Sequence, residues 1–77
     1  MERAQRRDSA MTPQQLRQFV RFCHVPLLGY PPQQGRLALR LVTDHLQRRT
    51  PARWLPDILY AHGLPRYARA LNVILSL

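Results

Sequence analysis

Residues 12–23 read TPQQLRQFVRFC, and this stretch carries the signals that decide the fold. Thr12 can accept a hydrogen bond as a helix N-cap, Pro13 suits the first helical position, and Gln15 stands at the capping-box position. Four apolar residues follow the i, i+3, i+4, i+7 spacing of one helix face: Leu16, Phe19, Val20 and Cys23. The stretch therefore predicts an amphipathic helix that ends at about Cys23.

The next stretch predicts a loop and then a second helix. Residues 24–32, HVPLLGYPP, contain three prolines and one glycine, a composition typical of a loop. Residues 33–49 return to helical periodicity, with these residues on the predicted core face: Ala38, Leu41, Val42 and His45, widened by Leu37, Leu39 and Leu46. We therefore expect a second amphipathic helix over residues 33–49.

Two further helical segments are predicted towards the C-terminus. Thr50 and Pro51 repeat the threonine–proline start signal and open a third segment. Pro56 leaves two alternatives for this segment, one uninterrupted helix or a short turn followed by a restart at Pro56. Gly63 predicts the C-terminal end of the segment, and Pro65 begins the last helix.

The whole pattern is that of an all-α protein. No segment shows sustained strand alternation, no short hairpin signal occurs, and no internal repeat stands out. A chain of 77 residues has room for one core. We therefore expect a small single-domain bundle of three to four short helices over residues 11–77, preceded by a flexible basic arm over residues 1–10.

Charge is the most informative feature of the composition. All twelve basic residues are arginines, against four acidic residues, so the formal net charge is +8. Such a charge attracts nucleic acid, anionic surfaces or acidic proteins. The charged N-terminus is unlike an export signal, and no apolar run approaches the roughly 18 residues that a membrane helix needs. The single cysteine fits a reducing compartment. We expect a soluble, cytoplasmic protein with no membrane partner.

Nine of the arginines recur in short-range groups along the predicted helices, mostly away from the apolar faces. Such rows could contact nucleic-acid phosphates from several directions. The candidate nucleic-acid-binding residues are Arg17, Arg21, Arg36, Arg40, Arg48, Arg49, Arg53, Arg66 and Arg69. The alternative interpretation is that these arginines are only the solvated side of amphipathic helices.

Residues 56–75 combine a helix, a short glycine turn and a second helix, which invites comparison with the helix-turn-helix DNA-binding motif. Arg66 and Arg69 would then be the natural base-reading residues. The register is poor, because Leu59 stands where a small residue is usual. Arg69 and Asn72 fall where buried apolar residues are needed. The alternative is an ordinary helical hairpin.

The polar residues form no recognisable catalytic or metal-binding pattern. The potential zinc ligands are Cys23, His24, His45 and His62, and they lack the close ligand pairs typical of zinc sites. The carboxylates are not spaced as an acid–base pair, and there is no glycine-rich phosphate loop or metalloprotease helix. We therefore expect no enzyme activity, no catalytic residue, no metal site and no cofactor.

Apolar residues outside the predicted core indicate protein contacts. We expect Trp54 and Tyr67 to fill the core, whereas the proline-rich loop and the last helix carry further apolar side chains. The candidate protein-interaction residues are Leu27, Leu28, Tyr30, Leu71, Ile74 and Leu75. With Val73 and Leu77, the apolar residues of the last helix cover more than one face and predict a homodimer.

The function predicted from these features is that of a non-catalytic basic helical protein that binds nucleic acid, as a small regulator or accessory factor. DNA is favoured over RNA. The alternative is a protein-interaction module, an inhibitor or adaptor that docks an acidic partner surface. Nucleic-acid binding predicts that the arginine rows converge on one continuous face, whereas an interaction module predicts an apolar patch at their centre.

Overall fold

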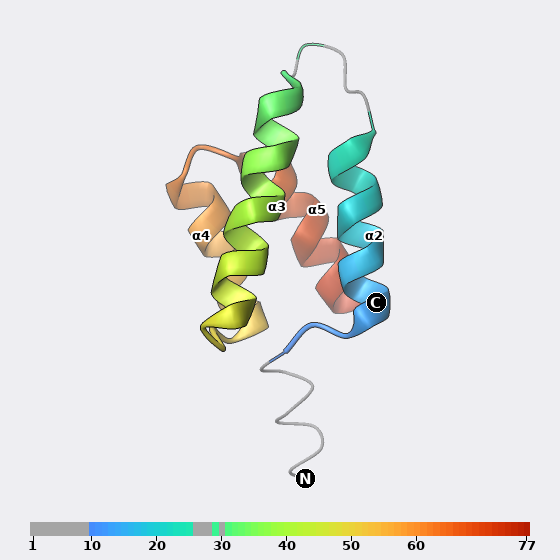
Figure 1. Ribbon diagram of the computed structural model, residues 1–77, viewed down its shortest axis with the longest axis vertical. Coiled ribbons are helices and arrows are strands. Elements are labelled where there is room, and N and C mark those ends of the chain that lie inside the picture. The colour runs from blue at the N-terminus through green and yellow to red at the C-terminus, as the bar shows by residue number, and fades with distance from the viewer. Residues whose placement is uncertain (1–9, 26–28, 30) are drawn as a thin grey trace, which may run out of the picture.

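The computed structural model of the chain describes residues 10–25, 29 and 31–77, and every regular element among them is helical. The elements are α2 (Pro13–His24), α3 (Pro32–Gln47), the 3₁₀ helix η1 (Ala52–Trp54), α4 (Leu55–Ala61) and α5 (Pro65–Ser76) (Figure 1). The all-α prediction is confirmed. The predicted arm, apart from Ala10, lies outside the described residues, as do residues 26–28 and 30 of the predicted loop.

The helices pack around one centre. α2 and α3 lie side by side and run in opposite directions, α5 lies behind them, and α4 lies beside α3 (Figure 1). α5 packs against both α4 and α2, and α3 packs against the same two helices. No described helix is long and apolar enough to cross a membrane.

One hydrophobic core joins all four α-helices. α5 buries four side chains in it: Tyr67, Ala68, Leu71 and Ile74. The other helices contribute fully buried side chains: Phe19, Ala38, Val42, Leu55 and Leu59. The rings of Phe22 and Tyr67 meet edge to face with centroids 5.6 Å apart, a favourable aromatic geometry. The prediction that Tyr67 fills the core is confirmed.

The same prediction for Trp54 is wrong, because its side chain is 53% exposed. The third segment begins with the 3₁₀ turn η1, whose repeat of three residues puts Ala52 and Leu55 on one side. Both are buried, and Trp54 falls outside that side. The segment therefore follows the alternative of a short turn and a restart, with α4 beginning at Leu55 and Pro56 in its first turn.

The predicted capping box is present at the start of α2. The backbone N–H of Gln15 donates to Oγ1 of Thr12 at 3.1 Å, and the backbone N–H of Thr12 donates to Oε1 of Gln15 at 2.9 Å. These two bonds satisfy donors that a helix start otherwise leaves without partners. The sequence signal and the structure agree here because every group involved lies within four residues.

The third helical segment opens directly after the second threonine–proline pair, as predicted, but Thr50 does not cap it. Thr50 instead closes the end of α3: its N–H donates to the carbonyl oxygen of His45 at 2.9 Å, and its Oγ1 lies 3.1 Å from Nδ1 of His45. Arg49 has a φ of 62°, in the left-handed region that favours glycine at a helix end. η1 then begins after Pro51 without a side-chain cap.

Gly63 ends α4 as predicted. Its φ is 74°, and its N–H donates to the carbonyl oxygen of Tyr60 at 3.0 Å. The N–H of Leu64 donates to the carbonyl oxygen of Leu59 at 2.9 Å. The pair of bonds is a Schellman motif, in which glycine adopts the left-handed conformation without a steric cost. The turn brings the start of α5 directly back onto α4.

Gly35 sets how closely α2 and α3 approach each other. It is buried inside α3, and a Cβ atom at this position would collide with the backbone carbonyl of Cys23 in the last turn of α2. The same atom would lie 3.4 Å from the hydroxyl of Tyr67. Gly35 was not predicted to have a role, although a glycine inside a helical pattern often marks close packing.

Candidate binding faces

All nine candidate arginines are exposed. The described residues contain two carboxylates, Asp44 and Asp57, and both are exposed as well. The excess positive charge is therefore on the surface, where a partner could meet it. By their positions on the helices, the arginines divide into three groups.

The contact at Gly35 fixes which sides of α2 and α3 face each other. Because Gly35 packs on the backbone of Cys23, the side of each helix that carries these residues points to the other helix. Residues three or four positions away share a helix side. Val20 therefore lies on the α2 side that faces α3, and Leu39 lies on the α3 side that faces α2.

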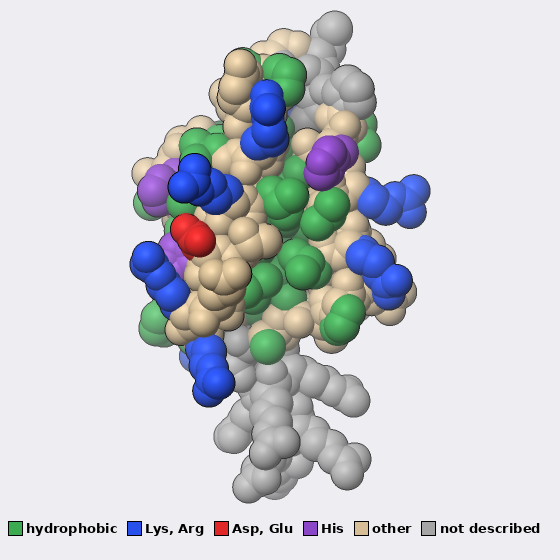
Figure 2. Space-filling view, in the orientation of Figure 1, with side chains coloured by type: hydrophobic (Ala, Val, Ile, Leu, Met, Phe, Trp, Pro, Cys, Tyr) green, Lys and Arg blue, Asp and Glu red, His purple; other side chains and the backbone are tan. Residues whose placement is uncertain are grey.

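An apolar strip follows the seam between these two helices. It consists of four partly buried side chains: Leu16, Val20, Leu39 and Leu46. Figure 2 shows hydrophobic side chains reaching the surface between the two helices. Helical periodicity places these four residues on core-facing sides, but it does not show that they remain partly open to solvent.

Two arginines on each helix flank the apolar strip: Arg17 and Arg21 on α2, and Arg36 and Arg40 on α3. Residues 17–21 read RQFVR and residues 36–40 read RLALR, so both helices carry arginines three residues before and one residue after a strip residue. Figure 2 shows basic side chains along both edges of this face. An apolar centre with a charged rim is the general form of a protein–protein interface.

α5 presents a second face. After Pro65, its exposed side chains are Arg66, Arg69, Asn72, Val73 and Ser76, and we call this set the α5 stripe. Nε of Arg69 donates to the hydroxyl of Tyr60 at 3.4 Å, which ties the stripe to α4. Because α5 lies behind α2 and α3 and buries its other side, the α5 stripe faces away from the apolar strip (Figure 1).

The α4–α5 hairpin does not pack as an orthodox helix-turn-helix. Leu59 is fully buried at the position where that motif has a small residue. Arg69 and Asn72 are exposed at positions where the motif buries apolar side chains. The exposed side of α5 is therefore not the side that the second helix of that motif exposes.

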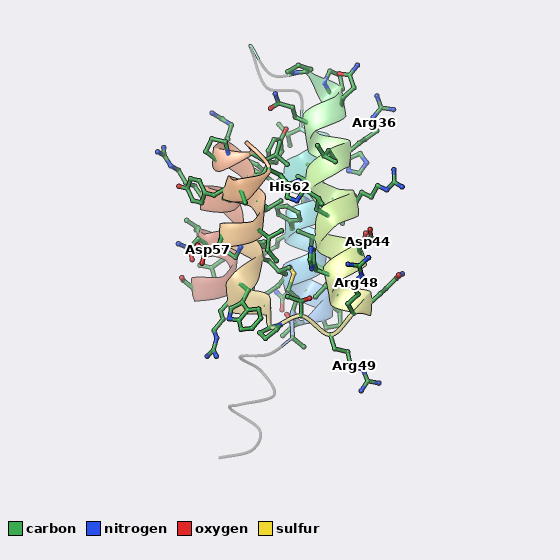
Figure 3. The ribbon with its side chains drawn as sticks, turned by 90° about the vertical axis from the view of Figure 1, so that its left-hand side faces the viewer. Arg36, Asp44, Arg48, Arg49, Asp57 and His62 are labelled. Carbon is green, nitrogen blue, oxygen red and sulfur yellow. The ribbon has the colours of Figure 1, made fainter. Side chains whose placement is uncertain are left out.

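The third group of arginines surrounds the end of α3. Arg48 and Arg49 project outward there, while Arg36 lies at the opposite end of the helix (Figure 3). Arg53 follows in η1. The nine arginines therefore lie on several sides of the molecule, and the single continuous basic face expected of a nucleic-acid-binding protein is not formed by them. Contact with nucleic acid would involve only a subset of these arginines.

Two of the candidate protein-interaction residues belong to the core of the chain itself. Leu71 and Ile74 are buried, so their assignment to a partner surface is corrected, whereas Leu75 is only partly buried and its assignment stays a prediction. The exposed large apolar residues at this end of the chain are Val73 of α5, at 62%, and Leu77 directly after α5, at 82%. The three loop candidates lie outside the described residues: Leu27, Leu28 and Tyr30.

The cysteine and histidines do not gather. Among residues 10–25, 29 and 31–77, no group of three Cys, His, Asp or Glu side chains could hold a metal ion. Nδ1 of His24 lies 2.8 Å from the carbonyl oxygen of Val20, and His45 pairs with Thr50. Burial raises the pKa of the Cys23 thiol to about 12, so the thiol stays protonated at neutral pH.

We expect Cys23 to react slowly with a chromogenic disulfide reagent at about pH 8. The thiolate is the reactive form, and a pKa of about 12 leaves almost none of it in the folded protein. Unfolding in urea restores an ordinary thiol, so the rate should rise at least about tenfold. Equal rates in buffer and in urea would show that Cys23 is not shielded.

Comparison with known proteins provides no functional assignment. No family model matches the chain, and no curated protein or solved structure is significantly similar to it. The apolar strip, the α5 stripe and the surface charge are therefore the features that indicate function.

Proposed function

We propose that this chain is a non-catalytic protein that binds duplex DNA through α5, as a small regulator or accessory factor in the cytoplasm. The α5 stripe carries this proposal. Arginine and asparagine are the side chains that make bidentate hydrogen bonds to guanine and adenine edges, and both types occur in the stripe. Val73 adds an apolar side chain of the kind that contacts the thymine methyl group.

The surface charge supports the same partner. Nine exposed arginines against two exposed carboxylates attract a polyanion, and each phosphate contact releases condensed counterions. The arginines around the end of α3 lie outside the α5 stripe, so they are available for the phosphate backbone rather than for bases. Such contacts position a protein, whereas base contacts give it sequence preference.

The shape of the element favours DNA over RNA. α5 has 12 residues and is therefore about 18 Å long. The major groove of B-form DNA, about 12 Å wide, accepts an α-helix, whereas the major groove of A-form RNA is too deep and narrow for side-chain readout. A homodimer through Val73 would cover the α5 stripe. The predicted homodimer is compatible with DNA binding only if it forms around Leu77.

The test is a pair of double variants with equal loss of charge. Replacing Arg66 and Arg69 with alanine should weaken duplex binding and lower the log–log salt slope by roughly one unit for each lost phosphate contact. If either arginine reads a base, its loss should cost on the order of 1–3 kcal/mol at one sequence only. Fluorescence anisotropy across a salt series measures both quantities.

The control replaces Arg17 and Arg21 with alanine, which removes the same charge from the opposite face. This variant should lose less affinity and keep its stability within about half a kcal/mol. The Arg66/Arg69 variant should lose about 1 kcal/mol of stability, because it also removes the bond from Arg69 to Tyr60, and circular dichroism checks that it stays folded. Equal losses in the two variants would show that net charge alone drives binding, without a role for α5. Absence of duplex binding at low salt, where attraction is strongest, would rule the proposal out.

A protein-interaction module, an inhibitor or adaptor, is the second candidate function. The apolar strip favours it, because partly exposed apolar side chains make favourable contacts with a protein surface but not with a phosphate backbone. This face lies on the opposite side of the molecule from the α5 stripe. The two functions can therefore coexist in one chain.

A further inference from the structure

We infer that the apolar strip and its four flanking arginines bind an acidic amphipathic helix of a partner protein. This inference concerns a different face from the α5 stripe and does not depend on DNA binding. Two properties of the face specify the chemistry of the partner: its apolar centre and the positive charge along its two edges.

The apolar centre calls for a partner element with a continuous hydrophobic side. The strip runs along the seam of two antiparallel helices, and its residues come from both: Leu16 and Val20 from α2, Leu39 and Leu46 from α3. A seam between two helices is the usual seat for a third helix, which anchors itself through apolar residues spaced i, i+3, i+4 and i+7. The partner segment is therefore helical and apolar on one side.

The two edges call for negative charge on both flanks of that helix. The patterns RQFVR in α2 and RLALR in α3 place a pair of arginines on each side of the strip. Asp44 follows Arg40 by one turn on the same side of α3, so it offsets part of the positive charge on that edge, whereas Asp57 lies on α4 and away from the strip (Figure 3). Asp or Glu residues on either side of the partner's apolar row would meet guanidinium groups at the rim of the interface.

A second copy of this chain does not fit the face. Its own strip would bring arginines against arginines, and like charges across an interface cost several kcal/mol. Nucleic acid fits less well than a peptide helix, because phosphates could pair with the arginines but would leave the apolar strip against a polar backbone. An acidic amphipathic helix satisfies the strip and both edges together.

The experiment uses the full chain and a fluorescent synthetic peptide of about 16 residues, the length of α3. The peptide carries leucines at the helical spacing and glutamates on both flanks. A scrambled peptide of identical composition is the first control, since it keeps the charge and loses the apolar side. We expect the ordered peptide to bind at least about tenfold more tightly, because one apolar face can then be buried as a unit.

The chain variants locate the binding face. Replacing Arg17 and Arg36 with alanine removes one arginine from each edge and should weaken peptide binding about fivefold to tenfold, as expected for two rim charge pairs. Val20→Thr keeps the side-chain shape and adds a hydroxyl to the strip, so it should weaken binding as well. The matched control, Arg66→Ala with Arg69→Ala, should leave peptide affinity unchanged. Circular dichroism verifies that each variant is folded.

Three results would overturn the inference. Equal binding of the ordered and scrambled peptides would show charge attraction without docking. Unchanged affinity in both the Arg17/Arg36 variant and Val20→Thr would place the peptide elsewhere. Finally, if the Arg17/Arg36 variant loses duplex DNA binding while peptide binding stays the same, the face belongs to nucleic acid.

Discussion

Gly35→Ala is expected to destabilise the protein by about 1–3 kcal/mol, the usual cost of overpacking. The added Cβ would collide with the backbone carbonyl of Cys23, and backbone in the last turn of α2 cannot move aside as a flexible side chain would. The hydroxyl of Tyr67, 3.4 Å away, limits the space on the other side. The helices would have to separate, and the apolar strip would change with them.

The sign of this effect makes the test decisive. In an exposed helix interior, exchanging glycine for alanine stabilises by about 1 kcal/mol, so a loss of stability can only come from the contact. A change of 1 kcal/mol shifts the melting temperature of a domain this small by roughly 4–8 °C. Arg40→Ala, an exposed position in the same helix, should have almost no effect. A higher melting temperature for Gly35→Ala would mean that α2 and α3 do not meet at this point.

The features that were predictable from the sequence depend on near neighbours. The capping box joins Thr12 to Gln15, and the turn at Gly63 joins residues no more than five positions apart. Signals of this kind act before any tertiary packing exists. The starts of α2 and α5, the glycine turn and the all-α class follow from them.

The sequence analysis was incomplete or wrong where one local signal is compatible with more than one local structure. Thr50 has the same sequence signal as Thr12, but the chain uses it to close α3 through His45. Trp54 is the largest side chain of its segment, yet the 3₁₀ turn directs Leu55 inward in its place. Local propensity cannot distinguish these outcomes, since tertiary contacts override it.

The candidate binding faces were also predictable only in part from the sequence. That Arg17 and Arg36 lie on solvent sides could be read from helical periodicity. Periodicity could not predict that these two arginines flank one apolar strip, because the strip depends on the antiparallel contact between α2 and α3 at Gly35. The sequence placed Ile74 on a partner surface for a related reason: periodicity does not say how many helices surround α5. Packing by both α2 and α4 uses more of its circumference than one neighbour would.

Replacing Ile74 with glutamate is therefore expected to unfold the protein rather than to dissociate a dimer. Ile74 lies in the core with 7% of its surface exposed, and a carboxylate there would have no partner. Such a burial costs more than the roughly 3–5 kcal/mol that a core of this size supplies. The variant should lose its cooperative thermal transition in circular dichroism.

Val73→Glu is the matched control, one residue away on the same helix. Val73 is 62% exposed, so the same charge should leave the fold intact. The free energy of unfolding should fall by at most about 1 kcal/mol, part of it from repulsion by the negative end of the helix dipole. Sedimentation of the unmodified protein and of this variant then tests the homodimer. If α5 pairs through its exposed apolar residues, Val73→Glu should convert a dimer to a folded monomer. A monomeric unmodified protein at high concentration would end the homodimer prediction, and a folded Ile74→Glu variant would show that the end of α5 is not part of the core.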